Sequence, residues 1–162
     1  MSPKATALLA AALLALSPAL QAGEAASGHD HHGHAAPQKL QLNAGKPWPT
    51  DASLRQAMGN INQAMAEALP RIHKNRFTPG DYQGLAAKVQ GEIAYAVENC
   101  RLEPEADAML HLVIADLAGG AEAMAGKGKA SGHDGAVKVL AALQSYGRYF
   151  DHPGWRAAGA NH

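Results

Sequence analysis

Residues 50–73 read TDASLRQAMGNINQAMAEALPRIH, and apolar side chains recur in this stretch at every third or fourth position. That spacing places them on one face of an α-helix, where they form a continuous stripe. Thr50 and Asp51 precede the pattern and can cap the helix, whereas Pro70 disturbs its last turn. The stretch therefore predicts an amphipathic helix that ends near His73 and packs against other helices. Its stripe consists of Leu54, Met58, Ile61, Met65, Leu69 and Ile72.

Three further helical patterns follow. Thr78-Pro79 and Glu103-Pro104 each open one, because Pro suits the first helical position and Thr is a good cap. The short connections between the patterns make consecutive helices antiparallel neighbours. We therefore expect an all-α, up-down-up-down four-helix bundle over residues 50–155, followed by a flexible C-terminus at 156–162. The expected helices span about 51–73, 78–100, 103–124 and 134–150.

The composition agrees with packed helices, because aromatic residues make up only 5% of the chain while Ala and Leu abound. The single cysteine, Cys100, excludes an intramolecular disulfide, so stability must come from packing. The 14 basic and 14 acidic residues balance, which gives no reason to expect nucleic acid or an anionic membrane surface as a partner. Aligning the helices antiparallel predicts a central core layer of Ile61, Ile93, Val113 and Leu143.

The first 22 residues have the pattern of an export signal. Lys4 supplies a positive charge, residues 5–16 are an unbroken run of Ala, Leu and one Thr, and Pro18 ends that run. The sequence Ala-Leu-Gln-Ala then ends at Ala22, where a signal peptidase can cleave. The apolar run is too short to span a membrane. We expect a signal peptide at 1–22, a periplasmic location and no membrane association after cleavage.

Residues 29–34, shortly after the expected cleavage point, read His-Asp-His-His-Gly-His. Imidazole is the commonest metal ligand among side chains and suits copper, zinc and nickel. The surrounding residues 23–38 are rich in Gly, Ala and Ser and are expected to be disordered. A Pro-rich connector completes residues 23–49, and its Trp48 is expected to cover one end of the bundle. The pattern predicts a metal-capture site, and the alternative is a solvated linker with incidental histidines. The predicted ligands are His29, His31, His32 and His34.

Sulfur donors gather at one end of the predicted bundle. The antiparallel alignment places Met58, Cys100 and Met109 near the start of the first helix, with His111 beside the core stripe. Thioether and thiolate ligands select Cu(I), so these four residues are a candidate metal site. The alternative is structural, because Met commonly fills gaps in a core and a buried Cys is usually an inert apolar residue. In that case His111 is a boundary residue with its hydrogen bonds satisfied.

The first helix, which begins SLRQAMGNIN at residue 53, resembles the opening helix of the cytochrome b562 and cytochrome c-prime bundles. In the b562 type, a Met at the position of Met58 is an axial haem ligand, and a His late in the fourth helix is the other. Gly147 stands near that second place here, and the Cys-x-x-Cys-His attachment pattern is absent. The runs NCRLEPEAD (99–107) and YFDHPGW (149–155) also resemble a group of exported proteobacterial proteins labelled DnrO-like. That resemblance implies a loose connection with metal resistance, particularly to copper.

Enzyme patterns are missing from the sequence. It contains no Gly-rich phosphate loop, no nucleophile elbow, no His-Glu-x-x-His and no Glu-x-x-His pairs of the di-iron bundles. We therefore predict a non-catalytic periplasmic protein that binds or buffers a transition metal, copper first and zinc or nickel as alternatives. An envelope metal-handling protein is a candidate partner. The competing hypotheses are a structural or protein-interaction module of the cell envelope and, third, a b-type haem protein.

Overall fold

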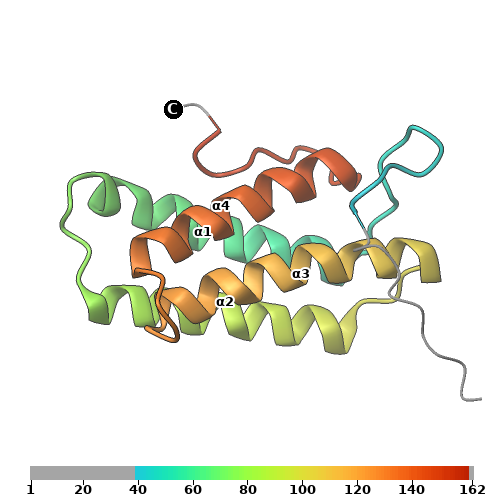
Figure 1. Cartoon of the computed structure of the whole chain (residues 1–162). Helices are drawn as coiled ribbons and strands as arrows, with labels where there is room; N and C mark the ends of the chain where they lie inside the picture. The colour runs from blue at the N-terminus through green and yellow to red at the C-terminus, as the bar shows by residue number, and fades with distance from the viewer. Residues whose placement is uncertain (1–38, 161–162) are drawn as a thin grey trace, which may run out of the picture. The chain divides into compact units, whose positions relative to one another are not determined.

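Four α-helices make up the regular structure of residues 39–160 (Figure 1). The structure is a computed structural model that describes residues 39–160, and no β-strand occurs among these residues beyond two isolated bridges. The predicted all-α class is confirmed for this part of the chain. The predicted signal peptide (1–22) and the histidines of residues 29–34 lie outside the described residues. The helices are α1 (Ala52–His73), α2 (Pro79–Asn99), α3 (Pro104–Met124) and α4 (Gly132–Tyr149).

Capping side chains explain where the helices begin. The side chain of Asp51 accepts a hydrogen bond of 2.7 Å from the backbone N–H of Leu54, so α1 starts where the sequence predicts. The start of α4 differs from the prediction, because this helix begins at Gly132 and not at residue 134. Ser131 and Asp134 form a capping box there, in which each side chain accepts from the backbone N–H of the other. That box adds two residues to the helix.

The predicted stripes meet in one apolar core. All six stripe residues of α1 are buried, and none exposes more than 6% of its surface. Val113 and Leu143 are buried in the same core, whereas Ile93 is only partly buried and packs at its border. The prediction that Ile93 lies in the central layer is therefore wrong. The buried residues of α2 are Leu85, Ala86, Val89 and Ala96. Among residues 39–160, no helix combines the length and apolarity that crossing a lipid bilayer requires.

The connector before α1 joins the end of α4. The backbone N–H of Trp48 donates to the carbonyl of Tyr149 at 2.7 Å, and the N–H of Asp151 donates to the carbonyl of Trp48 at 2.8 Å. The Trp48 ring is partly buried against the core, as expected for a residue that covers a bundle end. These contacts hold the start of α1 beside the end of α4.

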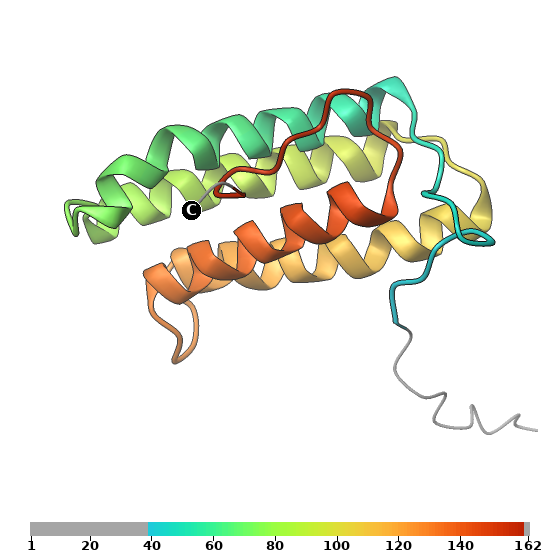
Figure 2. The ribbon, with the colours of Figure 1, turned by 90° about the horizontal axis from the view of Figure 1, so that it is seen from above.

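Residues 151–160 run back along α1 and α4 after the last helix, and we call them the C-terminal strap (Figure 2). The side chain of Asn62 on α1 donates to the carbonyl of Arg156 at 2.9 Å and accepts from the N–H of Ala158 at 2.7 Å. Ala158 is 7% exposed and belongs to the core. Asn62 therefore joins the strap to α1 through the backbone of two strap residues.

Candidate functional site

Three of the four predicted bundle ligands lie on the hydrophobic core. Met58 and Met109 are inside it, 1% and 3% exposed. Cys100 follows α2 directly, is half-buried and packs against the same core. Both thioethers have apolar surroundings, which suit a gap-filling role as well as a soft ligand.

The thiol of Cys100 is held in its neutral form. Burial, together with the carboxylates of Asp51 and Asp107, raises the pKa of Cys100 to about 11, against the opposing effect of Arg101. The thiolate is the form that attacks electrophiles and binds metals. Cys100 is therefore a poor nucleophile at neutral pH, and a metal ion would have to displace its proton.

His111 does not join the sulfur residues. Its side chain is 60% exposed on α3. The ring nitrogen Nδ1 lies 2.9 Å from the carbonyl oxygen of Asp107 and 3.4 Å from Oδ2 of the same residue, one turn earlier in the helix. Within residues 39–160, no three side chains of His, Cys, Asp or Glu are placed together to hold a metal ion. The four predicted tail ligands, His29, His31, His32 and His34, lie outside that range.

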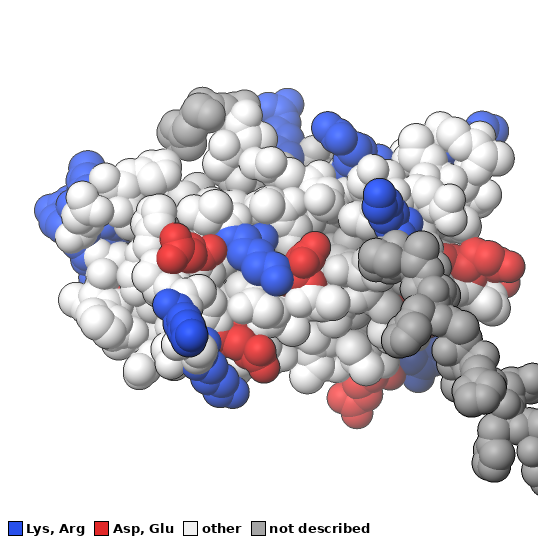
Figure 3. All heavy atoms as spheres, viewed as in Figure 1, with Lys and Arg blue, Asp and Glu red and all other residues white. Residues whose placement is uncertain are grey.

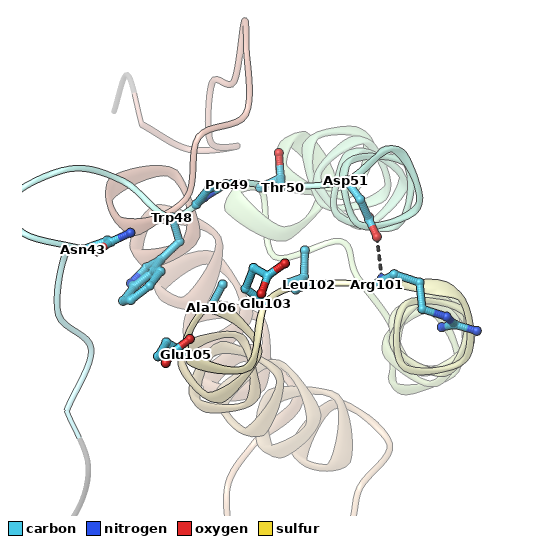
Figure 4. A pocket seen from close by; sticks show the side chains of 10 residues that line it. All are labelled: Asn43, Trp48, Pro49, Thr50, Asp51, Arg101, Leu102, Glu103, Glu105 and Ala106. Atoms are coloured by element: carbon cyan, nitrogen blue, oxygen red, sulfur yellow. Dashed lines mark hydrogen bonds between the residues drawn. The ribbon is translucent and has the colours of Figure 1, made fainter.

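A depression of about 580 Å³ opens at the end of the bundle near Cys100. Figure 4 shows Trp48 on one side of it and Arg101 on the other, with Glu103 between them. The carboxylate of Asp51, at its edge, already accepts from the backbone N–H groups of Leu54 and Arg101, the latter at 2.6 Å. The indole N–H of Trp48 donates to the carbonyl of Gln41. The Asp51 carboxylate and the Trp48 indole thus already have hydrogen-bond partners within the protein, and these bonds hold the connector in place.

Charged side chains of both signs are interspersed on the face shown in Figure 3. One pair of opposite charge joins Lys138 of α4 to Asp116 of α3, with 3.5 Å between Nζ and Oδ1. Pairs as exposed as this one contribute little to stability. No single-sign patch stands out on that face.

A second cluster, which the sequence analysis missed, joins α4 to the C-terminal strap. Tyr146 is fully buried, and its hydroxyl lies 3.0 Å from Nδ1 of His152. The indole of Trp155 packs edge-on against the Tyr146 ring at a centroid distance of 4.7 Å, and Phe150 stacks on the same ring at 5.3 Å. Gly147 makes room for the indole, because a Cβ at that position would overlap Trp155. The sequence signal was the Gly next to Tyr146, with His and Trp at short spacing behind it.

Burial shifts both titratable groups of this cluster toward their neutral forms. The pKa of Tyr146 is raised, chiefly by burial. The pKa of His152 is lowered from its usual 6.5 by burial and then by the positive charge of Arg55. At neutral pH the pair is an uncharged phenol and an uncharged imidazole.

The residues present do not fit haem as the cytochrome resemblance would require. Gly147, at the place of the second axial ligand, has no side chain, and the indole of Trp155 fills the space beside it. Met58, at the place of the first ligand, is packed in the apolar core. These two positions therefore do not supply the pair of axial ligands that the resemblance implies. Comparison with protein-family models, curated proteins and solved structures gives no match for this chain.

Proposed function

We propose that the protein is exported to the periplasm and binds or buffers a transition metal ion, copper in first place, through the histidines of residues 29–34. The observation that carries this proposal is the density of imidazoles, four within six residues. Imidazole binds copper, zinc and nickel without a preformed cavity when several lie on one short segment. The signal-like residues 1–22 support export.

In this proposal the four helices have no catalytic role and carry the metal-binding residues 29–34. Consecutive helices alternate in direction. The start of α1 lies beside the end of α2, because the side chain of Asp51 accepts a hydrogen bond from the backbone N–H of Arg101. The start of α1 also lies beside the end of α4, where Trp48 bonds to Tyr149. Both contacts support an up-down-up-down order. The resemblance to the DnrO-like group agrees with an exported protein concerned with metal.

Met58, Met109 and Cys100 serve as a second site, selective for Cu(I), in the same proposal. Sulfur ligands favour that ion. Their burial and the protonated thiol of Cys100 slow the loading of this second site. His111 is left out of this second site, because its ring is exposed and bonded to Asp107.

A second candidate function is a protein-interaction module of the cell envelope, in which residues 23–38 are only a linker. The depression between Trp48 and Arg101 favours it, since this surface combines an aromatic ring with the free carboxylates of Glu103 and Glu105. A cationic side chain of a partner protein fits that combination.

Calorimetric titration of the intact protein with Cu(II), Zn(II) and Ni(II) tests the proposed function. We expect binding at about pH 7.5 that weakens as the pH falls through about 6.5, because protons compete for the imidazole nitrogens. Copper should bind most tightly of the three. Absence of heat with all three ions would leave the interaction module as the better account.

A further inference from the structure

The C-terminal strap covers the seam between α1 and α4 (Figure 2). Besides its bonds to Asn62 of α1, it reaches both helices at Gly159, where a Cβ would lie 3.7 Å from Leu69 of α1 and 3.8 Å from Leu140 of α4. Ala158, next to it, is buried in the core. Detachment of the strap would therefore expose apolar surface of both helices to water.

His152 and Trp155 attach the strap to α4. Nδ1 of His152 lies 3.0 Å from the Tyr146 hydroxyl, and the indole of Trp155 packs against both the Tyr146 and the His152 rings. The indole N–H of Trp155 is itself buried, and no acceptor for it exists among the described residues. A buried donor without an acceptor weakens a contact. Among the described residues, the hydrogen bond between Tyr146 and His152 is thus the side-chain hydrogen bond that joins the strap to α4.

In the direction in which the Tyr146 hydroxyl donates to Nδ1 of His152, that hydrogen bond requires an imidazole with no proton on Nδ1. The hydroxyl of Tyr146 is buried, and Nδ1 of His152 is the partner that the structure gives it. An imidazole protonated on Nε2 alone accepts the phenol O–H at Nδ1. When Nδ1 takes up a proton, it becomes a donor, and the phenol O–H is left without an acceptor in an apolar place. The new positive charge also stands in the field of Arg55.

We propose that the C-terminal strap is a pH-sensitive cover, closed while His152 is neutral and released from α4 when His152 takes up a proton. His152 is half-buried, so a proton can reach its ring from solvent. The charged and titratable groups that act on the Tyr146–His152 pair come from two helix ends and from the strap itself. They are Asp51 and Arg55 at the start of α1, Cys100 after α2, and Asp151 in the strap. Arg55 acts on His152 directly and opposes its protonation.

The direction of the pH effect follows from the folded and released states. The folded protein lowers the pKa of His152 below 6.5, so the released strap binds the proton more tightly than the closed one. The contribution of His152 to closure is therefore fully present above pH 6.5 and is lost as the pH falls below that value. Release should occur on acidification and not on alkalinisation.

A pH titration of the intact protein by proton NMR tests this proposal, with helix content followed by circular dichroism. The indole N–H of Trp155 gives one of only two such resonances in the chain. We expect this proton and the amide of Ala158 to lose protection from solvent exchange, with a midpoint below pH 6.5 and unchanged helix content. The variant His152→Asn should stay closed over the same range, because its side-chain oxygen can accept from Tyr146 but does not titrate.

Two more variants keep the test decisive. His111→Asn replaces an exposed histidine that contacts only its own helix, and the transition should remain as in the wild type. Tyr146→Phe removes the phenol donor and keeps the ring packing. In this variant the loss of exchange protection on acidification should be smaller than in the wild type. This comparison remains informative if His152→Asn fails to fold. Protection of Trp155 that persists until the helices themselves melt would overturn the proposal. Release of His152→Asn at the same pH as the wild type would overturn it as well.

Discussion

Gly120 of α3 and Gly135 of α4 face each other so closely that a Cβ on Gly135 would lie 2.5 Å from the carbonyl oxygen of Gly120. The same Cβ would lie 2.7 Å from the backbone nitrogen of Met124. Both obstacles are backbone atoms, which cannot move aside as the end of a flexible side chain can. The packing of α3 on α4 therefore depends on the absence of a side chain at these two positions.

Gly135→Ala should destabilise the protein by about 2–3 kcal/mol, because α3 and α4 must separate to admit the methyl group. Gly84→Ala is the matched control, since a Cβ at this position in α2 meets nothing within 4 Å. That control should be neutral or stabilising by up to about 1 kcal/mol, the usual gain of Ala over Gly in a helix. Urea denaturation measures both. Equal effects of the two substitutions would contradict the close approach.

Ile61→Asp should cost about 3 kcal/mol or more, because it places an unpaired carboxylate in a core where Ile61 is only 1% exposed. Gln63→Asp, on the exposed face of the same helix, should change the free energy of unfolding by about 0.5 kcal/mol. Ile93→Asp should fall between the two, since Ile93 is at the border of the core. A loss at Gln63 as large as that at Ile61 would show that the buried face of α1 is wrongly assigned.

Cys100 should react slowly with Ellman's reagent in the folded protein. With a pKa of about 11, only roughly one thiol in 3,000 is ionised at about pH 7.5. The rate should rise about tenfold for each pH unit until the pH nears that pKa. The protein unfolded in urea supplies the control, because its thiol should react as an ordinary cysteine does. Fast reaction of the folded protein at neutral pH would contradict the burial of Cys100.

The helices could be predicted from the sequence because their signals are local. The apolar period of α1, the Thr78 and Asp51 caps and Pro at the starts of α2 and α3 all act within a few residues. The contacts of the C-terminal strap could not be predicted from the sequence, because the hydrogen bond between Asn62 and Ala158 joins residues 96 positions apart. The period of apolar residues along a helix gives no information on such a distant contact.

The candidate site was predictable only in part, for a related physical reason. His111 follows the buried Leu110 directly, and one residue of α-helix turns a side chain by about 100°, which carries His111 out to solvent. Met58 and Met109 could be placed in the core from the sequence, because each lies on the apolar face of its own helix. The hydrogen bond of Tyr146 to His152 depends on how the chain turns after α4, which composition does not encode.

The proposed function requires the histidines of residues 29–34 to bind the metal ion. Calorimetric titration of Cu(II) into the wild type and into the variant with His29, His31, His32 and His34 replaced by Ala tests it most directly. The control variant carries His111→Ala and His133→Ala in the helical part of the chain. All three proteins should have the same helix content, since the fourfold substitution lies outside the four described helices and Ala suits the helical positions of the control.

We expect the fourfold tail variant to lose at least about 100-fold in Cu(II) affinity at about pH 7.5, or about 2.7 kcal/mol of binding free energy. The control variant should bind Cu(II) as the wild type does. A tail variant with an unchanged isotherm would contradict the claim and remove residues 29–34 as the metal site.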